Sequence, residues 1–117
     1  MVTFQLEKMR PLLPGLLMAS TFLMCSSELL ARDVEAGRAK SQMCAVCHGA
    51  QGIATAPDAP HLAGQPAIYV SSQLQAYRSG TRKHEVMAVM ARGLTDDDIS
   101  NLAAWYASLR IEVQNPR

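Results

Sequence analysis

The run Cys44-Ala45-Val46-Cys47-His48 constrains this chain more than any other feature, because it places two thiols three positions apart and an imidazole directly after the second. Residues at i and i+3 share one face of a helix, so both thiols can add to the vinyl groups of one porphyrin. His48 then lies under the ring, where a neutral imidazole nitrogen can bind iron. This spacing is that of a c-type haem attachment site, and it predicts one covalently bound haem c with its iron.

Two other kinds of site also use a Cys-x-x-Cys pair. A thioredoxin-like dithiol is expected within a βαβ pattern, and the later chain shows no alternating strand signals of that kind. A structural zinc site would need a second pair of ligands, whereas His61 and His84 are far apart and lack His-x-x-x-His spacing. The sequence therefore favours haem.

The N-terminus carries the pattern of an export signal. Lys8 and Arg10 precede an apolar stretch of about thirteen residues, which is too short to span a bilayer. We expect residues 1–31 to be a signal peptide, cleaved somewhere within 27–31, and residues 32–117 to form one haem-binding domain. Bacteria attach haem of this type outside the cytoplasm, so we expect a periplasmic protein.

Cys25 follows the apolar stretch, at the place where a bacterial lipoprotein carries its lipid. Met24 before it argues against that interpretation, because lipoprotein signal peptidase sites prefer Gly or Ala there. Membrane anchoring through the N-terminus, by a lipid or by an uncleaved segment, is therefore the less favoured alternative.

The expected mature chain has about ninety residues, so a core of its own would be marginal, and a buried porphyrin would supply the missing apolar surface. Both remaining cysteines are committed to haem, and no disulfide is expected. With 11 Lys and Arg against 10 Asp and Glu, the net charge is +1. This balance gives no reason to expect nucleic acid as a partner.

Helical patterns cover most of the chain and strand patterns are almost absent, which predicts an all-α fold. The first helix is expected over 34–47, where Gly37 suggests a close helix contact. A loop over 49–65 follows, long enough to wrap a ring. The second helix should begin near Pro66 and end at Gly80.

The last helix should begin at Thr95, because Thr95 and Asp98 have the spacing of a capping box. It should pack on the first helix, with Gly37 leaving room for Trp105 or Tyr106. Before it lies a basic group that is either a solvated face or a docking patch. The members of this group are Arg78, Arg82, Lys83 and Arg92.

The sixth iron ligand decides the chemistry. Met87 is our choice, since it lies about forty residues after His48 in the stretch 81–94, which we interpret as an irregular loop able to bring a soft sulfur to the iron. The competing ligands are Met90, His61 and His84. A surface role is the expectation for the two histidines.

Beyond the haem motif, many short segments resemble the class I cytochromes c, and among them the bacterial cytochrome c4 and c553 type. The resemblance covers essentially all of the expected mature chain. The matching positions are 37–40, 48–49, Gly52, 60–65, Tyr69, 73–74, 77–80, Arg82, Met87 seven positions before Leu94, 94–96 and 102–106.

This resemblance implies a class I cytochrome c fold, with about three to five short helices wrapped around one haem. It implies that Cys44 and Cys47 attach the haem and that His48 and Met87 are the axial ligands. The separation along the sequence from Leu94, seven positions for Met87, favours Met87 over Met90. The resemblance also implies that the Pro60 carbonyl accepts the other ring proton of His48.

A protein of this kind is expected to be a one-electron carrier between respiratory or other redox enzymes, and not an enzyme. Cytochromes c4 proper have two such domains, whereas this chain has one haem motif. One alternative is a haem subunit of an oxidoreductase complex, for example beside a flavoprotein dehydrogenase. Another is a ligand-binding or peroxidatic haem protein, which would need an open sixth position.

Overall fold

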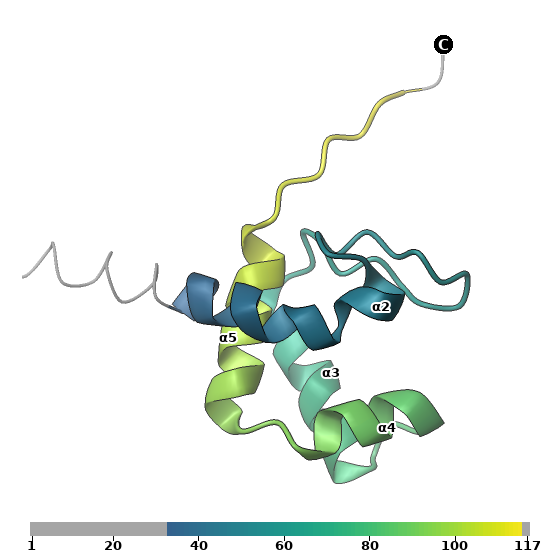
Figure 1. The fold of residues 1–117 in the computed structure, drawn as a ribbon, viewed down its shortest axis with the longest axis vertical. Coiled ribbons are helices and arrows are strands. Elements are labelled where there is room, and N and C mark those ends of the chain that lie inside the picture. Colours follow the sequence, from purple (N-terminus) through teal and green to yellow (C-terminus); the bar gives the residue numbers. More distant parts are fainter. Residues whose placement is uncertain (1–32, 116–117) are drawn as a thin grey trace, which may run out of the picture.

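The structure, a computed structural model, describes residues 33–115, and these contain helices and loops but no strands (Figure 1). The expected all-α class is confirmed. Residues 33–40 are helical. The elements that follow are η1 (Ser41–Met43), a 3-10 helix, and the α-helices α2 (Ala45–His48), α3 (Ala67–Ser79), α4 (Glu85–Arg92) and α5 (Asp96–Ser108). The expected signal peptide, residues 1–31, lies outside the described residues. Among residues 33–115, no helix combines the length and apolar character needed to cross a membrane.

Both ends of α3 and the start of α5 follow the sequence signals. Pro66 directly precedes α3, and Gly80 ends it in the left-handed conformation, with φ of 78°. At the start of α5, the Thr95 hydroxyl accepts from the Asp98 amide at 3.1 Å, and the Asp98 carboxylate accepts from the Thr95 amide at 3.0 Å. The predicted capping box is therefore confirmed.

The Asp98 carboxylate also makes stability depend on pH. A backbone hydrogen bond from Thr95, with help from Lys40 at 3.0 Å, lowers the pKa of Asp98 below its ordinary value of 3.8. The Asp98 carboxylate takes up a proton at higher pH in the unfolded chain than in the folded protein. Its stabilising effect is therefore present above about pH 4 and is lost as the pH falls through the pKa of Asp98 in the folded protein. We expect Asp98→Asn to lower stability by about 1 kcal/mol at neutral pH and to flatten its loss in acid.

Urea denaturation at several values between about pH 6 and about pH 3 measures this effect. Asp97→Asn, an exposed neighbour in the same turn, is the control. An unchanged acid limb in Asp98→Asn would contradict the assignment.

The expected continuous helix over 34–47 is wrong. After residue 40 the chain tightens into η1 and resumes as α2 only at Ala45. The Ser41 hydroxyl donates to the Arg38 carbonyl at 2.8 Å, and the Cys44 amide donates to the Ser41 carbonyl at 2.9 Å. Local hydrogen bonds of this kind compete with the regular helical pattern.

The interpretation of 81–94 as an irregular loop is also wrong, because α4 occupies most of it. The ring of His84 caps this helix, accepting from the Met87 amide through Nδ1 at 3.3 Å. Histidine is not among the favoured N-cap residues, so the sequence contained no clear helix start. The loop expected over 49–65 is free of helix and strand, as predicted.

The core forms where α3 packs against both α4 and α5. Its buried members are Val70, Ala91, Leu94, Ile99, Leu102, Ala103 and Tyr106. The helix over 33–40 crosses α5 (Figure 1). The contact is close at Gly37, where an added Cβ would overlap the Asn101 carbonyl oxygen and lie 2.8 Å from the Trp105 Cβ. The predicted close contact with the last helix is confirmed, and it is mainly a contact with the backbone of α5.

Candidate haem site

The two cysteines lie in one turn of the chain. Cys44 occupies the junction between η1 and α2, and Cys47 lies within α2. Both thiols are half-buried and are not in a disulfide. The amides of Thr55 and Ala56 donate to the Cys47 carbonyl at 3.0 and 3.2 Å, so the following loop returns to this turn and holds it.

His48 is almost fully buried, with 7% of its surface exposed. Its Nδ1 lies 2.9 Å from the Pro60 carbonyl oxygen. A carbonyl only accepts hydrogen bonds, so Nδ1 must carry the proton and Nε2 of the neutral ring keeps its lone pair. The contact that the resemblance implied is present, and it leaves His48 in the tautomer that a metal ligand requires.

The other two histidines have the opposite arrangement. His61 Nδ1 accepts from the Ala54 amide at 2.8 Å, and His84 Nδ1 accepts from the Met87 amide. A neutral ring that accepts at Nδ1 carries its proton on Nε2 and has no lone pair left for a metal. Of the three histidines, only His48 is therefore prepared to bind iron.

The loop over 49–65 is held by its own backbone. The amides of Leu62 and Ala63 both donate to the Gly52 carbonyl, at 2.7 and 3.0 Å, and the Gly64 amide donates to the Tyr106 carbonyl at 2.8 Å. The bond from Gly64 fastens the end of the loop to α5, and the two bonds to Gly52 close the loop on itself. They also hold the segment that presents the Pro60 carbonyl to His48.

Met87 and Met90 lie three positions apart on α4, and both are half-buried. Residues with this spacing share a helix face, so the face offers two soft thioethers. Because α4 packs on α3, these sulfurs come from a different part of the fold than the cysteine turn.

Cys44 and Tyr106 meet inside the core. Burial raises the pKa of the Cys44 thiol, and it also raises the pKa of Tyr106, which is 2% exposed. The Tyr106 hydroxyl makes no well-formed hydrogen bond with any residue in 33–115. A buried hydroxyl without a partner costs free energy, and a group attached at Cys44 would border it. Together with the Nε2 lone pair of His48, this arrangement fits a haem bound at the cysteine turn.

Comparison with known proteins agrees with this chemistry. The cytochrome c family profile matches residues 34–110. The chain is 46% identical over 81 residues to cytochrome c-554(548) of Halomonas halodenitrificans, covering 67% of this chain and 98% of that one. It is 39% identical over 69 residues to a thiosulfate dehydrogenase electron acceptor of Stutzerimonas stutzeri, covering 56% of this chain and 32% of that one.

The fold is similar to the reduced recombinant cytochrome c4 from Pseudomonas stutzeri, with a TM-score of 0.62 and 36% identity. The similar region is 66% of this chain but only 45% of the cytochrome c4 chain, so this chain spans less than half of that protein. The Cys44 and Cys47 pair with His48 fits the attachment motif of the family. The chain belongs to the cytochrome c family, whose members are electron-transfer proteins that carry covalently attached haem c.

Proposed function

We propose that residues 32–117 act as a periplasmic monohaem carrier of single electrons, after removal of residues 1–31 as a signal peptide. The observation that carries this proposal is the hydrogen bond from His48 Nδ1 to the Pro60 carbonyl, directly after the cysteine turn. It prepares one imidazole nitrogen for iron beside two thiols that can form thioethers.

Each residue of the turn has a distinct role in this proposal. Cys44 and Cys47 tether the haem, and His48 Nε2 binds the iron from one side. The Pro60 carbonyl holds the ring orientation and increases the basicity of the ligand. When bound, haem c supplies an iron that changes between Fe(III) and Fe(II), one electron at a time.

Met87 is the proposed sixth ligand, with Met90 as the alternative on the same face of α4. A thioether stabilises the ferrous state, so the pair His48 and Met87 implies a comparatively high reduction potential. A protein ligand on each side of the iron would leave no position for a substrate. This arrangement suits a carrier better than a catalyst.

The partners are proposed to be redox enzymes that dock only briefly. The relative named thiosulfate dehydrogenase electron acceptor supports a dehydrogenase as the donor. The alternative is a haem subunit that stays bound to such an enzyme. Size-exclusion chromatography of native extract separates the two, because a shuttle elutes as a small free protein and a subunit elutes with its complex.

The optical spectrum of the purified holoprotein tests the ligation. We expect the oxidised protein to show the near-infrared sulfur-to-iron band and the reduced protein to bind carbon monoxide poorly, since both axial positions are filled. If the band is absent and carbon monoxide binds readily, the sixth position is open and a ligand-binding or peroxidatic role replaces the carrier role.

A further inference from the structure

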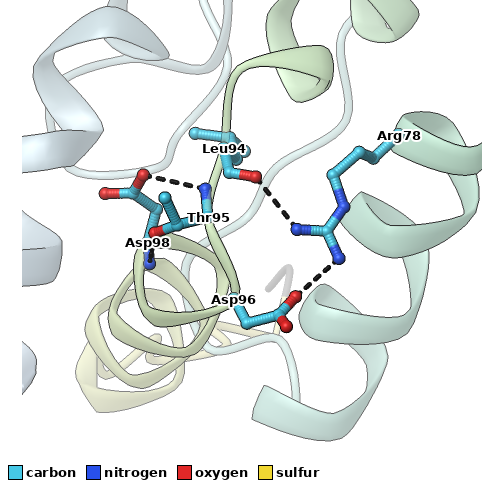
Figure 2. A network of polar contacts seen from close by, with 5 residues as sticks. All are labelled: Arg78, Leu94, Thr95, Asp96 and Asp98. Atoms are coloured by element: carbon cyan, nitrogen blue, oxygen red, sulfur yellow. Dashed lines mark hydrogen bonds and ion pairs between the residues drawn. The ribbon is translucent and has the colours of Figure 1, made fainter.

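A polar network joins α3 to the connection between α4 and α5 (Figure 2). The guanidinium of Arg78 donates from Nη1 to the Leu94 carbonyl at 2.9 Å, and its Nη2 lies 2.6 Å from an oxygen of Asp96. Leu94 is buried in the core, with 7% of its surface exposed. A side chain on α3 thus holds the backbone just beyond the end of α4.

The same connection is held from its other side. Asp98, which caps α5 through Thr95, also pairs with Lys40 at 3.0 Å. Lys40 lies at the end of the N-terminal helix, four positions before Cys44. Arg78 and Lys40 therefore link the segment after α4 to α3 and to the segment that leads into the cysteine turn.

Within the basic group, Arg78 bonds a backbone carbonyl of the core, whereas Arg82 bonds the Gln73 side chain and lies over the Tyr77 ring. The Arg78 side chain is 30% exposed and points inward to the Leu94 carbonyl, whereas Lys83 and Arg92 are exposed. The contact with the Leu94 carbonyl therefore shields part of its guanidinium from water. Asp96 is 82% exposed. An ion pair so open to water contributes little to stability. Of the two contacts of Arg78, the hydrogen bond to the Leu94 carbonyl is therefore the one that stabilises the packing.

We propose that Arg78 is a positioning residue for the sixth iron ligand. By bonding the Leu94 carbonyl it fixes the end of α4 against α3 and so keeps Met87 at the iron; this inference rests on the proposed ligation by Met87. Without Arg78, the part-buried Leu94 carbonyl would have no hydrogen-bond partner as long as α4 stays packed on α3. Movement of α4 away from α3, which we call opening, would let water bond that carbonyl. Opening, and with it loss of the thioether, becomes easier.

Imidazole titration of the ferric holoprotein, followed by the sulfur-to-iron band, tests this directly. Imidazole binds only when the thioether has left, so its apparent affinity reports the open fraction. We expect Arg78→Gln to raise the apparent affinity for imidazole about fivefold or more. Arg78→Lys should raise it less, because the lysine ammonium can replace one of the two hydrogen bonds that the guanidinium makes. Arg92→Gln removes the same charge at the exposed end of α4, and Asp96→Asn removes only the ion pair; both should stay within about twofold of the parent.

The outcomes separate this inference from the function on which it rests. If the parent protein lacks the sulfur-to-iron band, ligation by Met87 fails and the inference fails with it. If the parent shows the band but Arg78→Gln binds imidazole no better than Arg92→Gln, only the role of Arg78 is overturned. A lower unfolding temperature with unchanged imidazole affinity would likewise reduce Arg78 to a structural residue. Arg78→Lys carries the test if Arg78→Gln does not fold.

Discussion

Replacing Met87 by alanine is expected to abolish the near-infrared sulfur-to-iron band while leaving the haem covalently attached. Attachment depends on the cysteine turn, and Met87 lies on α4, a separate element. Loss of the thioether removes the ligand that stabilises ferrous iron, so the reduction potential should fall by more than about 59 mV, a tenfold change in the equilibrium constant. Spectroscopy and potentiometric titration of the variant measure both effects.

Met90→Ala is the matched control, because Met90 is also half-buried and lies on the same face of α4. It should keep the band and shift the potential far less. The reverse pattern, with the band lost only in Met90→Ala, would make Met90 the ligand. A band that survives in both variants would place the sixth ligand elsewhere.

Gly37→Ala is expected to destabilise the protein by about 3 kcal/mol, although alanine is the better helix former by about 1 kcal/mol. The reason is the crossing with α5, where the new Cβ would overlap the Asn101 carbonyl oxygen and lie 2.8 Å from the Trp105 Cβ. A backbone carbonyl within a helix cannot move aside cheaply, so the two helices must separate. In a domain of this size the unfolding temperature should drop by at least about 10 °C.

Gly93→Ala provides the comparison for this prediction. A Cβ on Gly93 would meet nothing within 4 Å, and the φ of −90° suits any residue. We expect this variant to unfold within a few tenths of a kcal/mol of the parent, or slightly later. Equal stability of the two alanine variants in thermal unfolding would show that the crossing at Gly37 is not tight.

Several features that depend on neighbours along the chain were predictable, although the break in the helix after residue 40, which also involves local hydrogen bonds, was not. The cysteine turn, the capping box of Thr95 and Asp98 and the left-handed end of α3 at Gly80 each involve residues within a few positions of one another. The missed helix α4 marks the limit of this reasoning. Its cap is a histidine, which gives no clear start, although its apolar residues follow a strong helical period along the chain.

The sequence by itself determined that this chain carries a c-type haem motif in an all-α fold, because both conclusions follow from local spacing and periodicity. Only the tertiary structure decided which histidine keeps its Nε2 lone pair, since a tautomer depends on the partner of the other ring nitrogen. It also decided that Arg78 turns inward to the Leu94 carbonyl, 16 positions away. Hydrogen bonds over such separations arise only after helices have packed, so no reading of adjacent residues could assign them.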